Sequence, residues 1–232
     1  MRSSVWVRER RRPARETLSR AQVVRAAVEL LDEEGLAGLS MRKLADRLSA
    51  GATSIYWHVE TKDDLLEYAI DEIYGEVDVP DPQLAGWRSG VTLFAHSLRA
   101  TILRHPWFSE VASSRISIGP NAMSLSKRAG VLFRAAGFTG FELDHAQSAL
   151  VSYVLGNAGS QAAWLATVKA SGKTVTEWSE DAYEQVLQAA DDDYPELRQR
   201  IAVWRSADPL QALEAAFTFG LECLLDGFEG RL

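Results

Sequence analysis

The chain has 232 residues, of which 47% are hydrophobic and 25% charged, a composition typical of soluble globular proteins. This length allows a small domain beside a larger one. Because no apolar run reaches the length of a membrane span and no signal-peptide core is present, we expect no membrane contact and a cytoplasmic protein. The only cysteine is Cys223, which excludes a disulfide framework and a thiolate metal cluster.

Charge is distributed unevenly along the chain. Residues 1–62 hold 12 Lys and Arg against 8 Asp and Glu, a balance of +4, whereas the remaining residues hold 13 against 24, a balance of −11. A basic end on an acidic body orients a protein on a polyanion and keeps the body away from it. The imbalance therefore favours nucleic acid as a partner of the N-terminal part.

Residues 1–18 form a basic arm without apolar periodicity, which we expect to be disordered in the free protein. An arm of this kind can lay arginines on phosphates or in a minor groove. The candidates are Arg8, Arg10, Arg11, Arg12 and Arg15. A solvated tail without a function is the alternative, because charge runs are common at termini.

Residues 19–35 are predicted to form a helix that braces the two helices after it. Ser19 and Gln22 have the spacing of a capping box, and apolar residues continue at helical spacing to Leu31. Gly35 is expected to end the helix.

Residues 39–62 read LSMRKLADRLSAGATSIYWHVETK and predict a helix-turn-helix. Ser40 is the expected N-cap of a short helix over 41–48. Residues 49–51 break the apolar pattern, and Gly51 is free to take a positive φ.

A second short helix needs only Ile55 and Val59 to hold it to the first. The side chains expected to point outward are those of Thr53, Ser54, Tyr56, Trp57 and His58. Aromatic and hydrogen-bonding groups crowded on an exposed helix face suit a helix that lies in a DNA major groove.

This stretch resembles the DNA-binding domain of the TetR family of transcriptional regulators. The segments LSMRKLADRL and SIYWHVETK follow the family signature, with Ser49-Ala50 in place of the usual Gly-Val, and YWHV is the version found in the tetracycline-repressor branch. The resemblance implies DNA contacts by Ser40, Arg42, Thr53, Ser54, Tyr56, Trp57, His58 and Lys62. Of these, His58 and Lys62 are expected on phosphates, Lys62 near a helix N-terminus.

A connecting helix is predicted from Lys62 to about Val77, with Thr61 and Asp64 at its cap. The extended segment VDVPDP then ends it. We therefore predict two domains after the arm: residues 19–78, the helix-turn-helix domain with its connecting helix, and residues 82–232, the body.

The body is also predicted to be helical, which makes the fold class all-α: a three-helix helix-turn-helix DNA-binding domain plus a larger helical ligand-binding and dimerisation domain. Helices are expected over 87–104, between Gly119-Pro120 and Gly137, and over 141–168. Residues 169–193 are polar and are expected to form a loop holding a short helix over 183–190. Pro195 and Pro209 mark the first turns of two further helices.

The final helix carries two neighbouring apolar stripes. One comprises Leu213, Phe217, Leu221, Leu224 and Phe228, and the other Ala212, Ala216, Phe219 and Cys223. The segments GWRSGVTLFAHSLRATILRHPWF, SYVLGNAGSQ and FTFGLECLLDGFE resemble the C-terminal domain of the tetracycline-repressor branch. The resemblance implies a homodimer in which the long helix and the final helix of each subunit form the interface, with Leu213, Phe217, Leu221 and Leu224 in it, and a small-molecule pocket in the body.

Aromatic and amide side chains of the body suit a pocket for a flat, largely apolar effector, although residues of these types more often belong to a core or an interface. The candidates are His96, Trp107, Phe108, Asn121, Phe133, Tyr153, Asn157, Gln161 and Trp164.

A metal chelate is not expected as the effector. In the tetracycline repressor the drug binds as a magnesium chelate through a histidine and a glutamate, and counting from shared anchors places Ser113 and Ser160 at those positions. A position that supplies an amide to the drug falls on Phe94. Because hard cations need carboxylates or water-supporting groups, we expect neither tetracycline nor a metal or other cofactor here.

Catalysis has little support, because nucleophile-elbow, phosphate-loop and zinc-protease motifs are absent and the four histidines are scattered along the chain. The predicted function is a ligand-responsive repressor, not an enzyme, that binds a palindromic double-stranded DNA operator as a homodimer. The alternative is an effector-independent architectural DNA-binding protein, whose body would hold no cavity.

Overall fold

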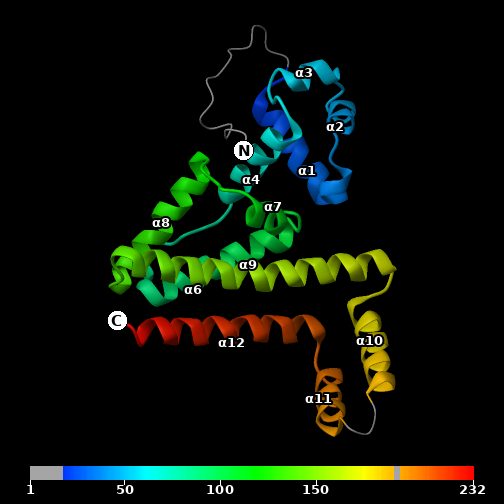
Figure 1. The fold of residues 1–232 in the computed structure, drawn as a ribbon, viewed down its shortest axis with the longest axis vertical. Coiled ribbons are helices and arrows are strands. Elements are labelled where there is room, and N and C mark those ends of the chain that lie inside the picture. Colours follow the sequence, from blue (N-terminus) through cyan, green and yellow to red (C-terminus); the bar gives the residue numbers. More distant parts are fainter. Residues whose placement is uncertain (1–17, 191–193) are drawn as a thin grey trace. The chain divides into compact units, whose positions relative to one another are not determined.

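The computed structural model describes residues 18–190 and 194–232, and within these ranges the chain forms twelve α-helices and no strand (Figure 1). The helices are α1 (Arg20–Gly38), α2 (Met41–Arg47), α3 (Ala52–Tyr56), α4 (Lys62–Tyr74), α5 (Pro82–Ala85), α6 (Trp87–Arg104), α7 (Phe108–Ser114), α8 (Pro120–Ala136), α9 (Gly140–Ser171), α10 (Val175–Ala189), α11 (Pro195–Arg205) and α12 (Pro209–Glu229). The predicted all-α class is confirmed. Of the helices in this part of the chain, none is long and apolar enough to cross a membrane.

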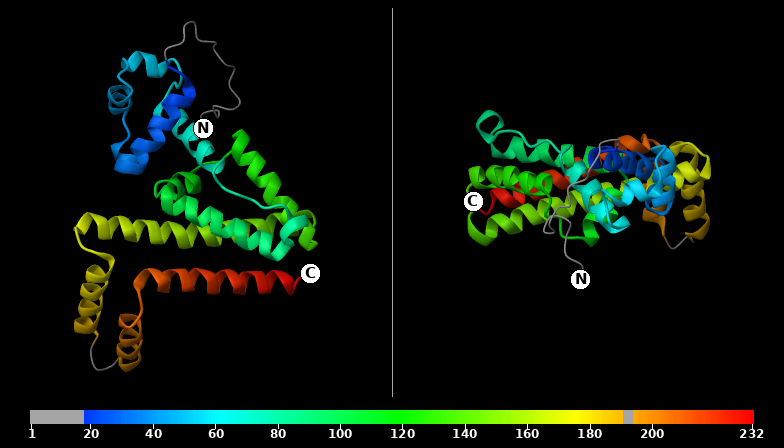
Figure 2. Two further views of the ribbon diagram at one scale, coloured as in Figure 1. Left: turned by 180° about the vertical axis from the view of Figure 1, so that it is seen from behind. Right: turned by 90° about the horizontal axis from the view of Figure 1, so that it is seen from above.

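The chain divides into two compact units, Met1–Leu155 and Gly156–Leu232, and the boundary falls inside α9. In the first unit α4 is the central connector, because it packs against α1, α7 and α8, while α6 packs against α8. In the second unit α10 packs against both α11 and α12, and the side-by-side arrangement of α10 and α11 is visible in Figure 2.

Side-chain caps define the starts of the N-terminal helices. The predicted capping box is confirmed, since Ser19 Oγ accepts from the Gln22 N–H at 3.2 Å and Gln22 Oε1 accepts from the Ser19 N–H at 2.8 Å. Ser40 caps α2 and Thr61 caps α4 in the same way, by accepting from the backbone N–H three residues later. Each cap satisfies an N–H group that has no partner within its helix.

Two helix ends depart from the predicted positions. Gly35 has a left-handed backbone (φ 68) that kinks the chain as expected, but helical structure resumes and α1 ends at Gly38. α4 ends at Tyr74 rather than near Val77, because Gly75 is the C-cap and its N–H bonds back to the carbonyls of the last turn.

The turn between α2 and α3 corrects the prediction for Gly51. The positive φ falls on Ser49 (φ 50), whereas Gly51 has an ordinary φ of −69. The Ala50 N–H bonds to the Ala45 carbonyl at 3.0 Å, so the chain reverses immediately after α2 and the left-handed residue must be Ser49.

The short helix predicted over 183–190 is present but is part of the longer α10, so the expected loop is wrong for residues 175–182. Thr174 and Glu177 form a capping box, in which the Glu177 carboxylate accepts from the Thr174 N–H at 2.8 Å. The prediction missed this helix start because the segment around it is polar. Trp178 anchors the new helix by packing edge-on against Trp164, with ring centroids 5.8 Å apart.

Other predicted elements are confirmed: α6 spans 87–104, α8 lies between Gly119-Pro120 and Gly137, and Pro195 and Pro209 begin α11 and α12. On α12 the buried stripe is Phe217, Leu221, Leu225 and Phe228. Leu225 is buried in place of the predicted Leu224, which is half-buried; steps of three or four residues both keep a side chain on one helix face, so spacing alone did not separate the two.

Candidate nucleic-acid interface and ligand cavity

A small apolar core holds α2 and α3 together. Leu44 and Ala45 of α2 are buried, Ile55 and Val59, the two residues expected to anchor the second helix, are also buried, and α2 packs against α3. Since the buried residues are enough to hold α3 in place, Thr53, Ser54 and Tyr56 are not needed in this core.

The outward face of α3 is aromatic. Trp57 is 70% exposed and Tyr56 is 50% exposed. Thr53 is exposed beside them, while Ser54 and His58 are partly exposed. Within the described residues, no hydrogen bond or ring contact joins Tyr56 or Trp57 to another side chain. A large exposed aromatic pair of this kind lies outside the core and is a candidate recognition surface.

Three further predicted DNA contacts, Ser40, Arg42 and Lys62, differ in what their side chains do within the chain. Arg42 is exposed on α2, while the Ser40 hydroxyl is used as a helix cap. Lys62 Nζ donates to the Leu36 carbonyl at 3.0 Å, a contact that joins the start of α4 to the end of α1 and that sequence spacing did not indicate.

Two further cations of α2, not singled out from the sequence, fasten it to α1. Lys43 forms an ion pair with Glu34, and Arg47 forms one with Glu33. All four groups are partly exposed, so each pair contributes little stability, but both fix the orientation of α2. The candidate arginines of the arm, Arg8, Arg10, Arg11, Arg12 and Arg15, lie outside the described residues.

A cavity of about 190 Å³ lies in the first unit among α4, α6, α7, α8 and the first half of α9. Its apolar lining consists of Phe94, Leu98, Phe108, Ala122, Leu125, Ala129, Val151 and Leu155, and its polar lining of Tyr74, Ser117, Ser126 and Gln147. No Asp, Glu, Lys, Arg or His of the described chain is among these lining residues.

The polar lining residues form two hydrogen-bonded pairs. The Ser117 hydroxyl donates to the Tyr74 hydroxyl at 3.3 Å, and Gln147 Nε2 donates to Ser126 Oγ at 3.5 Å. Burial raises the pKa of the Tyr74 phenol, so it stays protonated at neutral pH. Tyr74 also packs edge-on against Phe108, with ring centroids 5.0 Å apart.

Of the nine pocket candidates from the sequence, Phe108 lines this cavity. Trp107 is buried nearby but donates its indole N–H to Asp32 of α1 at 2.7 Å, and the Asn121 backbone N–H bonds to Asp71. Phe133 is packed in the core beside Phe138, while His96 and Tyr153 are half-buried.

The remaining candidates, Asn157, Gln161 and Trp164, belong to the second unit. Sequence reasoning missed most of the cavity lining because Leu98, Leu125 and Val151 occupy helix positions that look like ordinary core. Phe94, which counting along the sequence placed at the position of a drug-binding amide, supplies an apolar part of the wall.

The apolar stripes of α12 differ in exposure. Phe217 and Leu221, two of the predicted interface residues, are buried within the chain, while Leu213 and Leu224 are half-buried. The second stripe, Ala212, Ala216, Phe219 and Cys223, is exposed, and Phe219 is 69% exposed.

Two family models match the chain. Residues 23–69 match the model described as bacterial regulatory proteins of the tetR family, and residues 79–232 match the tetracyclin repressor-like C-terminal domain. Together the matches include the helix-turn-helix and all cavity-lining residues except Tyr74.

Curated relatives have the same helix-turn-helix description. An HTH-type transcriptional regulator of Saccharopolyspora erythraea is 40% identical over 195 residues, which cover 84% of this chain and 80% of the relative. The HTH-type transcriptional repressor DrrR1 of Streptomyces coeruleorubidus is 36% identical over 226 residues, covering 94% and 81% of the two chains.

Solved structures extend the likeness to the fold. The TetR family protein ActR of Streptomyces coelicolor, in complex with actinorhodin, superposes with a TM-score of 0.74 at 28% identity, covering 92% of this chain and 97% of ActR. The helix-turn-helix with its exposed aromatic face, the family matches and these relatives agree, and the chain therefore belongs to the TetR family as a DNA-binding transcriptional repressor.

Proposed function

We propose that this repressor binds a palindromic operator as a homodimer and releases it when a small, uncharged and largely apolar molecule occupies the cavity. One observation carries the proposal: α4 packs against α1 and also supplies Tyr74 to the cavity wall. We call α1 to α3, which contain the helix-turn-helix, the DNA-binding segment. A change in the cavity can therefore displace the support of the recognition surface. The domain division at residues 19–78 and 82–232 is proposed with it.

The lining defines the chemistry of the ligand. Since apolar side chains dominate and no formally charged group lines the cavity in the described residues, a charged ligand would lose its hydration without compensation. When two hydroxyls share one hydrogen bond, one hydroxyl hydrogen is left over, so the Tyr74–Ser117 pair can donate to a ligand oxygen. An aromatic or polycyclic compound with a carbonyl or hydroxyl group fits these requirements, and ActR, a relative, binds actinorhodin.

Release requires the ligand to bind the DNA-competent and DNA-incompetent arrangements unequally. Filling the cavity would tilt α4 through Tyr74, which would move the recognition helices off the spacing of successive major grooves, about 34–36 Å. The coupling free energy expected is on the order of 1–3 kcal/mol, and it acts in both directions.

The homodimer is proposed to form through the exposed stripe of α12, because four apolar residues at helical spacing would otherwise face water. A two-fold dimer presents two identical recognition helices, which is the reason to expect a palindromic operator.

Calorimetry tests the linkage. A panel of uncharged aromatic and polycyclic compounds is screened by thermal shift, and each hit is titrated with and without saturating operator duplex. Operator should weaken binding of the hit by the same factor by which the hit weakens operator binding. If operator leaves the affinity of every hit unchanged, an effector-independent architectural DNA-binding protein is the better description.

A further inference from the structure

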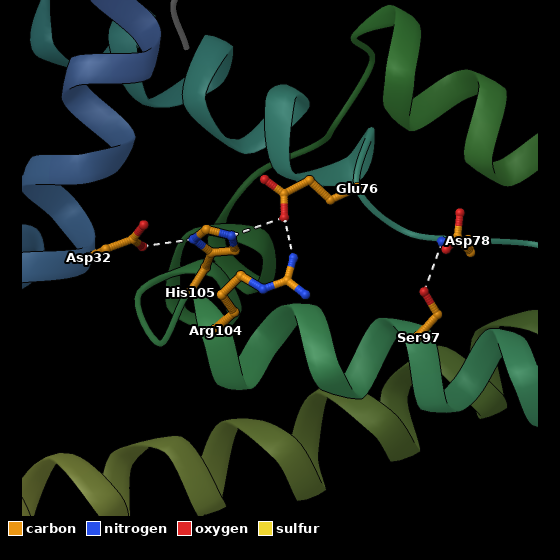
Figure 3. Close-up of polar contacts among 6 residues, drawn as sticks. All are labelled: Asp32, Glu76, Asp78, Ser97, Arg104 and His105. Atoms are coloured by element: carbon orange, nitrogen blue, oxygen red, sulfur yellow. Dashed lines mark hydrogen bonds and ion pairs between the residues drawn. The ribbon is translucent and has the colours of Figure 1, made fainter.

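His105 lies at a junction of three elements. It is the C-cap residue of α6, and its backbone N–H bonds to the Thr101 carbonyl at 2.9 Å. Its side chain is only 5% exposed and lies between a residue of α1 and one just beyond the end of α4, as Figure 3 shows. The Nδ1 atom is 2.8 Å from Asp32 Oδ1, and the Nε2 atom is 3.1 Å from Glu76 Oε2.

Both ring nitrogens therefore face carboxylate oxygens. An ionised carboxylate only accepts hydrogen bonds, so both contacts form only when both nitrogens carry hydrogen, which is the imidazolium form. In a neutral ring one nitrogen lone pair would face a carboxylate oxygen inside a nearly buried site, which is unfavourable.

The charges around the ring favour the same form. Asp32 reaches it from α1 and Glu76 from the segment after α4, and these are the charged groups that contact it. Arg104 of α6 also contacts Glu76, at 2.7 Å, and Trp107 donates its indole N–H to Asp32 at 2.7 Å. With His105 charged, two cations balance two carboxylates; with His105 neutral, one negative charge is uncompensated.

This cluster joins the DNA-binding segment to the body by a route that does not pass along α4. Asp32 lies on α1, just before the kink at Gly35, whereas His105 ends α6, a helix of the body. We propose that His105 in its imidazolium form is a positioning residue that holds α1 against the end of α6 in the arrangement that binds operator.

Deprotonation of His105 would release α1 at this point. The recognition helices would then have to be immobilised again on binding DNA, which costs affinity. Operator affinity should therefore fall when rising pH removes the imidazolium form that both contacts require.

The experiment compares wild type with His105→Gln at constant ionic strength between pH 5.5 and 8.5. Operator affinity is measured by fluorescence anisotropy on a duplex selected from a randomised pool. Any other pH-dependent contribution to DNA binding is common to both proteins, so the informative quantity is the difference in affinity between them. We expect the variant to bind about tenfold more weakly at pH 6, the loss of one charge-assisted hydrogen bond, and the gap to close as pH rises.

Trp107→Phe is the matched control, because it removes the other donor to Asp32 without removing a titrating group. It should keep the pH dependence of wild type. Parallel affinity profiles for wild type and His105→Gln would overturn the proposal. Nitrogen-15 chemical shifts of the His105 ring in the wild-type protein at pH 5.5, the lowest pH of the series, test it independently of any variant: two protonated nitrogens are expected, and a neutral tautomer would refute it.

Discussion

The carboxylate of Asp71 accepts a hydrogen bond of 2.9 Å from the backbone N–H of Ala122, so a side chain of α4 caps the first turn of α8. The Asn121 N–H bonds to the second carboxylate oxygen at 3.3 Å. Gly119 permits this approach, because a Cβ at that position would lie 2.1 Å from Asp71 Oδ1. The contact therefore joins α4, which packs against α1, to α8, one of the helices that line the cavity.

Replacing Asp71 with Asn should change how stability depends on pH. Burial raises the pKa of Asp71 above its usual 3.8, and its two backbone hydrogen bonds oppose that shift only in part. Because the folded-state pKa is the higher one, the unfolding free energy of wild type should fall relative to Asp71→Asn as pH rises from about 4 through the raised pKa, and then level off. Urea unfolding of both proteins from pH 4 to 8 measures the difference, and a constant difference would contradict the prediction.

Ser49 holds a left-handed backbone that glycine adopts more readily. Ser49→Gly should therefore raise the unfolding free energy, by about 0.5–1 kcal/mol, because it relieves steric strain between Cβ and the backbone. Gly51→Ala is the matched variant, since Gly51 has a negative φ and open space around its Cβ position. Thermal unfolding should show that alanine is tolerated at 51. Destabilisation by Ser49→Gly would argue against the left-handed turn.

Trp57 and Tyr56 are expected to read bases. Trp57→Ala or Tyr56→Ala should weaken operator binding by roughly 1–3 kcal/mol while leaving binding to scrambled DNA nearly unchanged. Because both side chains are half exposed or more and take part in no hydrogen bond or ring contact in the described chain, the fold should not suffer. Gel shifts on both duplexes measure the effect. Equal losses on the two would assign these residues to the DNA backbone.

The exposed stripe of α12 is expected to hold the homodimer together. Phe219→Arg should produce monomers with weakened operator binding, because it places a charge in an apolar interface. Leu84→Arg, at an 89% exposed position on α5, is the control and should leave the assembly intact. Sedimentation analysis distinguishes the two variants. A fully dimeric Phe219→Arg protein would place the interface elsewhere.

The basic arm is expected to contact phosphates. Deleting residues 1–15 should reduce the slope of log affinity against log salt by about 0.9 for each phosphate contact removed. Anisotropy titrations at several salt concentrations supply the slope. An unchanged slope would identify the arm as a solvated tail.

Helix starts and the exposed face of α3 could be predicted from the spacing of residues in the sequence. Ser19, Ser40 and Thr61 mark helix starts through hydrogen bonds to groups three residues away, and such contacts are readable from spacing alone. The outward aromatic face of α3 was equally predictable, because Ile55 and Val59 suffice to hold that helix.

Tertiary structure decided the rest. The cavity lining joins α4, α6, α8 and α9, and residues such as Leu98, Leu125 and Val151 carry no local mark that separates a cavity wall from a core. The placement of His105 between Asp32 and Glu76 depends on contacts 73 and 29 residues apart, which no periodicity encodes. Sequence spacing determines which face of a helix is apolar, whereas packing alone determines what that face meets.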